Sequence, residues 1–157
     1  MPIRTQLPQD REQVQQLAQA FLAFGPYPQI IMALFDQAGH QYASYGVIGE
    51  VELLVATGED ETCNGFVALE WSGPTLKIHA IAVQPALRRA GVARMLLEHA
   101  EAKARERGTI TSLDGITAET ENPAALQFFI NAGFENLGFA GYYPAGQRAV
   151  RLGKRIG

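Results

Sequence analysis

The chain has 157 residues, of which 47% are apolar, and its formal net charge is −3. That length fits a single domain over residues 1–157, and the apolar fraction is sufficient for a packed core, which excludes a disordered chain. The negative charge excludes the chain-wide positive field that recruits nucleic acid, so we expect no nucleic-acid partner.

Cysteine content and targeting signals narrow the class of protein further. Cys63 is the single cysteine, which excludes an internal disulfide and a cysteine-rich metal site, and we expect no bound metal. The opening segment MPIRTQLPQDRE lacks the apolar stretch of a secretory signal. No apolar run approaches the ~18 residues of a membrane span, so the sequence predicts a cytoplasmic protein without a membrane partner.

Two helices are predicted near the start of the chain, after a short strand at residues 3–6. Apolar residues recur at helical spacing between residues 10 and 24, and Gly25 and Pro26 end that helix. A second helix is predicted over residues 29–38, where the following glycine stops it.

Three strands are predicted next, over residues 50–59, 64–71 and 75–83. The first two are apolar runs separated by polar residues and glycine, a pattern typical of an antiparallel pair. The third is largely apolar on both faces, which indicates a central strand covered on both sides.

The second half of the chain alternates between the two periodicities. A helix is predicted over residues 92–107, a strand over 115–120, and a further helix that begins with Asn122 as its cap. The segments 134–143 and 147–156 are predicted to form a closing hairpin.

This order of elements predicts an α/β (α+β) fold. Its centre is a mixed, mostly antiparallel sheet with helices on both faces. Within that sheet the strand at 75–83 and the strand at 115–120 are expected to be parallel and joined by a right-handed crossover.

The segment RRAGVARMLLEHA, residues 88–100, suggests a place for an anion. The first turn of a helix presents unpaired N–H groups and a partial positive charge. Gly91 allows a ligand close to the backbone, and Arg88 can add bidentate contacts. The spacing is neither that of a dinucleotide fingerprint nor that of a Walker loop, and a solvated basic helix start is the structural alternative.

Two motifs together resemble the GCN5-related N-acetyltransferase (GNAT) family. The segment IAVQPALRRAGVARMLL is similar to motif A of that family, whose fingerprint Gln/Arg-x-x-Gly-x-Gly/Ala is matched by Arg88, Gly91 and Ala93. The segment ENPAALQFFINAGF is similar to the family's second signature, with matches at Asn122, Ala125, Phe129, Gly133 and Phe134. The resemblance implies the GNAT fold, in which the central parallel strands splay apart.

The resemblance also implies that acetyl-CoA binds in the V-shaped opening between those strands. The backbone of Ile81, Ala82 and Val83 would pair with the pantetheine arm. Arg88 would open the pyrophosphate loop, whose N–H groups come from Arg89, Ala90, Gly91, Val92, Ala93 and Arg94. Asn122 would reach the pantetheine, and Phe129 would line the thiol end.

Acetyl transfer to an amine needs a base, because an alkyl ammonium with a pKa near ~10.4 must lose a proton before it attacks. His79 is the best candidate, since it lies on the strand before the loop, in the alternation of Ile81 and Val83. The run IHAIAV is similar to the arylalkylamine N-acetyltransferases, which carry a histidine on this strand that acts through water. A core histidine is the alternative for His79, and Glu119 is the second candidate base.

The acid for the leaving thiolate is where the sequence departs from the family. Many GNAT members have Tyr where this chain has Phe129, which cannot donate a proton. Either the thiolate leaves without an enzymatic acid or another tyrosine serves. The segment GYYPAG offers Tyr142 and Tyr143, of which alternation aims one inward, and we expect Tyr143 to be that one.

The acceptor wall is expected from the N-terminal helices and the last hairpin. The candidate substrate-contacting residues are Phe24, Tyr27, Ile31 and Tyr142. The sequence therefore predicts an N-acetyltransferase, a monomer or homodimer, in which the amine of a small molecule or peptide N-terminus attacks acetyl-CoA directly in a ternary complex. The alternative is a module of the same fold that binds acyl-CoA without turnover, which the phenylalanine at 129 keeps open.

Overall fold

The computed structural model describes residues 2–22, 27–41, 44, 47–118, 123–143 and 146–157. The strands are β1 (Ile3–Thr5), β2 (Glu50–Thr57), β3 (Cys63–Ser72), β4 (Thr75–Val83), β5 (Ser112–Ala118), β6 (Glu135–Tyr142) and β7 (Arg148–Arg155). The α-helices are α1 (Arg11–Phe21), α2 (Tyr27–Asp36), α3 (Val92–Arg107) and α4 (Pro123–Asn131), and two short 3-10 helices are η1 (Pro8–Asp10) and η2 (Pro85–Ala90).

The strands form one seven-stranded sheet in the order β1-β2-β3-β4-β5-β7-β6. β4 and β5 are parallel, and the other neighbouring pairs are antiparallel. The predicted order of elements and the predicted fold class are confirmed. The 3-10 helix η2 was not predicted, and β5 begins at Ser112, three residues before the predicted start at 115.

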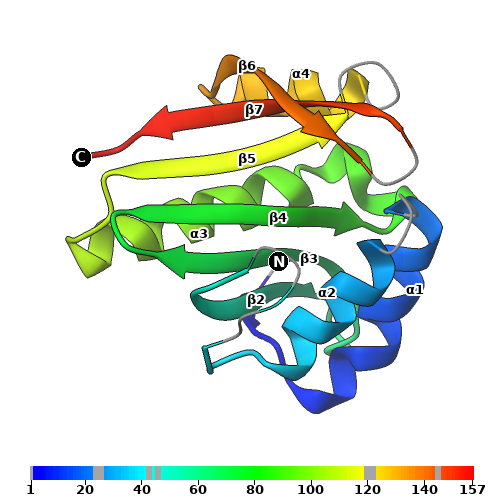
Figure 1. Cartoon of the computed structure of the whole chain (residues 1–157). Coiled ribbons are helices and arrows are strands. Elements are labelled where there is room, and N and C mark those ends of the chain that lie inside the picture. The colour runs from blue at the N-terminus through cyan, green and yellow to red at the C-terminus, as the bar shows by residue number, and fades with distance from the viewer. Residues whose placement is uncertain (1, 23–26, 42–43, 45–46, 119–122, 144–145) are drawn as a thin grey trace.

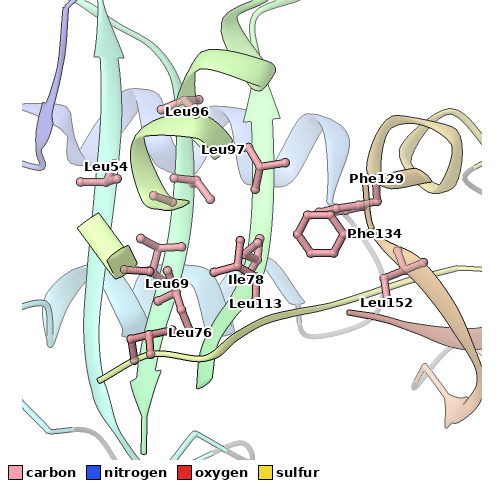
Figure 2. Packing of buried hydrophobic residues seen from close by; sticks show 14 of the residues in the cluster. Leu54, Leu69, Leu76, Ile78, Leu96, Leu97, Leu113, Phe129, Phe134 and Leu152 are labelled. Carbon is pink, nitrogen blue, oxygen red and sulfur yellow. The ribbon is translucent and has the colours of Figure 1, made fainter. Parts of the chain in front are cut away.

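Two hydrophobic layers cover the two faces of the sheet, as alternation along the strands requires. Leu54 of β2 belongs to a cluster under α3 and α4, whereas its neighbour Leu53 belongs to a cluster under α1 and α2. Figure 1 shows α3 behind the sheet and α1 and α2 in front of it. Figure 2 shows side chains of the first cluster, in which Leu96 and Leu97 of α3 pack against the strands. None of the described helices is long and apolar enough to cross a membrane.

The two parallel strands separate after a short paired section. Their pairing runs from Thr75 with Ser112 to Ile78 with Gly115, yet β4 continues to Val83. Figure 1 shows β5 moving away from β4 beyond this section. The splayed pair that the family resemblance implied is therefore present, and it opens the centre of the sheet.

A β-bulge lies in β4 where the separation begins. Ala68 of β3 pairs with Ala80, while the next residue, Leu69, pairs with Ile78. His79 is therefore an extra residue without a direct partner on β3. A bulge of this kind bends its strand and re-aims its side chains.

The bulge overturns one expectation about the faces of β4. Ile81 packs against the α3 cluster, and Val83 belongs to it. His79 instead contacts Glu70, which alternation places on the α1 and α2 face of the sheet. The prediction that His79 shares a face with Ile81 and Val83 is wrong, because the extra residue shifts the alternation.

Candidate functional site

A cavity of about 560 Å³ occupies the opening between β4 and β5, and we call it the main cavity. Side chains from both faces of the sheet reach it. Its lining residues are Ala20, Phe21, Leu22, Tyr27, Ile78, His79, Ala80, Ile81, Ala82, Val83, Arg88, Ala93, Ile116, Thr117, Ala124, Ala125, Phe128, Phe129 and Tyr143. Nine of the site residues predicted from the sequence line this cavity: Tyr27, His79, Ile81, Ala82, Val83, Arg88, Ala93, Phe129 and Tyr143.

The start of α3 has the local geometry of an anion site. Gly91 joins η2 to α3 with φ +77°, a left-handed conformation that side chains disfavour. A Cβ atom added at Gly91 would meet no atom within 4 Å, so the space beside its backbone is open. The first N–H groups of α3 have no carbonyl partner within the helix and are available to a ligand.

Arg88 has two contacts that fix its position at the edge of the main cavity. Its Nε donates a hydrogen bond to the carbonyl oxygen of Val83 at 3.3 Å. Its guanidinium lies 4.1 Å from the ring centroid of Phe21 on α1. Arg88 therefore ties the end of β4 to α1 at the edge of the main cavity.

The remaining loop residues differ in what their side chains do. Val92 is fully buried in the α3 cluster, so its side chain is part of the core. Arg94 is exposed and forms an ion pair with Glu98 at 3.1 Å, and Ala90 is exposed as well. For Val92, Arg94 and Ala90, the predicted contact with the cofactor therefore rests on the backbone N–H groups and not on the side chains. Phe24, Glu119 and Asn122 lie outside the described residues, as does the side chain of Arg89.

Phe129 serves both the core and the cavity. It is 7% exposed and makes edge-to-face contacts with Phe128 and Phe134, with ring centroids 5.4 Å and 5.1 Å apart. Its ring edge lies beside Gly115 on β5, where a Cβ atom would come within 3.7 Å of it. Phe129 therefore forms an apolar wall of the main cavity.

His79 is paired with a buried carboxylate that the sequence analysis missed. Its Nε2 lies 2.8 Å from Oε1 of Glu70, whose side chain is 0% exposed. The backbone N–H of Ile48 donates to Oε2 of Glu70 at 3.3 Å. Burial acts to raise the pKa of the Glu70 carboxyl, but these hydrogen bonds outweigh it and hold the pKa below its ordinary value. A lone acidic residue in the apolar run FVALEW was the signal that could have identified it.

Two tyrosines face each other beside His79. The rings of Tyr27 and Tyr143 meet edge to face, with centroids 6.2 Å apart, and the hydroxyl of Tyr27 donates to the carbonyl oxygen of His79. Burial raises the pKa of Tyr143 to about 12 and that of Tyr27 further still. Both phenols therefore keep their protons at neutral pH.

Two residues predicted for the acceptor wall lie elsewhere. Ile31 is 0% exposed in the α1 and α2 cluster and lines no part of the main cavity, because its side chain faces the sheet. Tyr142 is 67% exposed and packs on Phe139, with ring centroids 5.2 Å apart. The structure thus places Tyr143 at the main cavity and Tyr142 at the surface.

A second cavity of about 210 Å³ adjoins the main one. It is lined by Lys77, Ile78, His79, Asp114, Gly115, Ile116, Ala140 and Arg151. Arg151 contacts Asp114, with Nη2 to Oδ2 at 3.0 Å, and this hydrogen-bonded pair raises the pKa of Arg151. His79 lines both cavities and stands where they meet. Within the described residues, no three His, Cys, Asp or Glu side chains gather to hold a metal ion.

Comparisons with known proteins bear on this arrangement. The family model described as Acetyltransferase (GNAT) family matches residues 13–134. A candidate GNAT acetyltransferase from Desulfovibrio desulfuricans has a TM-score of 0.82 at 23% identity, and 99% of each chain is covered. Ard1 from Thermoplasma volcanium has a TM-score of 0.81 at 23% identity, covering 99% of this chain and 97% of that one.

A third solved structure contains a cofactor. It is NAA60 from Arabidopsis thaliana in complex with acetyl-CoA, with a TM-score of 0.75 at 13% identity, covering 99% of this chain and 98% of that one. At these identities the solved structures establish a shared fold. No curated protein sequence matches this chain.

Proposed function

The chain belongs to the GNAT acetyltransferase family, and from that premise we propose that it moves an acetyl group from acetyl-CoA to a primary amine of a small molecule or a peptide N-terminus. The family uses acetyl-CoA, which supplies the acetyl group as an activated thioester. The observation that carries the proposal is the position of His79 at the junction of two cavities. One cavity can hold the acetyl donor while the other admits the amine.

The features that support coenzyme A as the ligand lie in the main cavity and at the turn around Gly91, which is not itself one of the lining residues. The open space beside Gly91 and the N–H groups at the start of α3 suit a pyrophosphate. The stretch of β4 from Ala80 to Val83 continues past its pairing with β5, which leaves an edge for the amide-containing pantetheine arm. The apolar wall at Phe129 suits the acetyl and thiol end.

The second cavity is the proposed entrance for the amine. Asp114 and Arg151 are among its lining residues, and it shares His79, Ile78 and Ile116 with the main cavity. Lys77 and Arg151 give it two cationic groups against the single carboxylate of Asp114. This balance favours an acceptor that carries an anionic group as well as its amine over a polyamine.

The proposed reaction forms a bond from the amine nitrogen to the acetyl carbon and breaks the carbon–sulfur bond. The substrate ammonium gives up one proton before attack, which we assign to His79, directly or through water, and His79 returns it to solvent. The attacking nitrogen loses its second proton as the amide forms, and the sulfur takes up one proton, which we assign to the hydroxyl of Tyr143 at the main cavity. The second proton of the nitrogen then restores the Tyr143 hydroxyl. Because both substrates meet at His79, attack takes place directly in a ternary complex. Glu119 is the alternative base.

A second candidate function is binding of acyl-CoA without turnover. Phe129 favours it, because a phenyl ring stands where the family has a proton donor. The two functions make different predictions for the release of free thiol from acetyl-CoA across a panel of primary amines, with tertiary amines as controls. Acetyl transfer predicts thiol release that depends on a primary amine and an acetylated product by mass spectrometry. Tight CoA binding without thiol release above the no-amine rate would instead support a binding module.

A further inference from the structure

We infer that Glu70 is a positioning residue for His79: it holds the imidazole with its proton on Nε2, so that Nδ1 is the atom that accepts the proton of the amine. This inference rests on the proposed function, because it needs His79 to act as the base. It adds a residue on β3, outside both of the sequence motifs. It also assigns a definite nitrogen to the chemistry.

The contact between the two side chains determines which nitrogen is free. Nε2 of His79 lies 2.8 Å from Oε1 of Glu70. An ionised carboxylate can only accept hydrogen bonds, so Nε2 must carry the proton in this pair. Neutral histidine holds one ring proton, which leaves Nδ1 as the acceptor. The His79 side chain is 19% exposed and lines both cavities, so the ring is within reach of a bound amine or a water.

The Glu70 carboxylate is fixed in place by its surroundings. Its second oxygen, Oε2, accepts from the N–H of Ile48 at 3.3 Å. The adjacent Gly49 lies so close that a Cβ atom there would come 3.3 Å from Cγ of Glu70 and 2.3 Å from the carbonyl oxygen of Trp71. The backbone at Ile48 and Gly49 therefore covers the Glu70 side chain and restricts its rotamers.

The backbone of His79 is fixed as well. His79 is the extra residue of the bulge, which turns its side chain towards Glu70. The hydroxyl of Tyr27 on α2 donates to the His79 carbonyl oxygen. Glu70 of β3 therefore holds the imidazole and Tyr27 of α2 holds the backbone of the same residue, which is more than a solvated or loosely packed histidine requires.

During the proposed step the Glu70–His79 pair changes from a carboxylate beside a neutral imidazole to a neutral ion pair. His79 begins neutral, takes one proton at Nδ1 and becomes an imidazolium, and the Glu70 carboxylate stabilises that charge. Among the described residues, the other titratable groups that line the two cavities are Lys77 on β4, Tyr27 on α2, Tyr143 after β6 and Arg88 on η2, with Asp114 and Arg151 in the second cavity. The positive charges of Lys77 and Arg151 disfavour protonation of His79, and the buried carboxylate of Glu70 offsets that effect.

The test uses Glu70→Gln with a matched control in the same sheet. Glutamine keeps the size and the acceptor oxygen of Glu70 but removes its charge. Glu52→Gln is the control, because Glu52 is also a buried carboxylate, bonded to Trp71 Nε1 at 3.0 Å and to Lys103 of α3, outside both cavities. His79→Ala is measured beside them, and Glu70→Asp tests rescue by a shorter carboxylate.

The main readout is the pH profile of kcat/KM with acetyl-CoA and a reactive amine. Glu70→Gln is expected to move the acidic limb down by about one pH unit, because the imidazolium loses an opposite charge. It should lower kcat about tenfold while the KM for acetyl-CoA is unchanged. Glu70→Asp keeps the charge, so its acidic limb and its kcat should lie between those of Glu70→Gln and the parent. Glu52→Gln should match the parent in both quantities. If Glu70→Gln matches the parent while His79→Ala is impaired, the positioning role is overturned.

Nitrogen NMR of the parent protein supplies a readout that does not depend on any Glu70 variant folding. The ring nitrogens of His79, assigned by their loss in His79→Ala, should show the proton on Nε2 at a pH above the imidazole titration. A proton on Nδ1 would overturn the inference. If His79→Ala keeps the parent's rate and pH profile, the base assignment within the proposed function fails instead, and the two failures are thereby distinguished.

Discussion

The proposed pyrophosphate site and the proposed base are built in different ways. The pyrophosphate site comes from one continuous stretch, η2 and the first turn of α3, with Gly91 between them. The base His79 of β4 is instead held by Glu70 of β3 and Tyr27 of α2, beside Tyr143 after β6. The first site acts through its own backbone, whereas the second depends on contacts between distant elements. Changes at the pyrophosphate site should alter the binding of CoA, and changes around His79 should alter the rate.

The largest expected effect is loss of CoA binding in Gly91→Glu. The new side chain would enter the open space beside Gly91 and place a carboxylate where the pyrophosphate is proposed to bind. We expect the Kd for CoA, measured by calorimetry, to rise by at least about 100-fold from like-charge repulsion and steric exclusion.

Gly108→Glu at the other end of α3 is the matched control. Gly108 has φ +73° and no atom within 4 Å of an added Cβ, so it shares the backbone strain and open space of Gly91. It should lose stability to a similar degree while keeping the Kd of the parent. Equal loss of binding in both variants would attribute the effect to strain and remove the loop from the site.

The next effect is on rate, in His79→Ala. Removal of the proposed base should lower kcat about 100-fold and flatten the pH profile near neutrality, while the Kd for CoA changes less than about twofold. His99→Ala is the control, since His99 is exposed on α3. A rate and pH profile equal to those of the parent would make His79 a core histidine held by Glu70.

A smaller effect is expected for Tyr143→Phe. This variant removes the proposed donor to the sulfur and should lower kcat with acetyl-CoA about tenfold, with little change in stability. Tyr142→Phe should match the parent in a steady-state assay, because Tyr142 is a surface residue. If neither variant is impaired, the thiolate leaves without an enzymatic acid.

The smallest effect is expected for Tyr27→Phe. It deletes the hydrogen bond to the His79 carbonyl but keeps the ring contact with Tyr143. Loss of one buried hydrogen bond should lower the free energy of unfolding by about 1 kcal/mol in a denaturant titration. The kcat should fall only a fewfold, and a loss as large as that of His79→Ala would give Tyr27 a chemical role of its own.

The same contrast explains how much the sequence could predict. The order of elements, the parallel pair and the loop at Gly91 follow from periodicity and spacing within short segments. The bulge at His79 could not be predicted, because the sequence pattern of a strand that is apolar on both faces is the same with or without an extra residue. Glu70 is visible in the sequence as a lone acidic residue in the apolar run FVALEW, but its contact with His79 follows only from the pairing of β3 with β4.

The most direct test of the account is the rate of amine-dependent thiol release as a function of acetyl-CoA concentration, for Gly91→Glu and His79→Ala beside the parent. Gly91→Glu is expected to raise the KM for acetyl-CoA, whereas His79→Ala is expected to lower kcat and leave that KM unchanged. If both variants change the same parameter, or if the parent itself releases no thiol in response to any primary amine, the separate roles of the Gly91 turn in binding and of His79 in catalysis are contradicted.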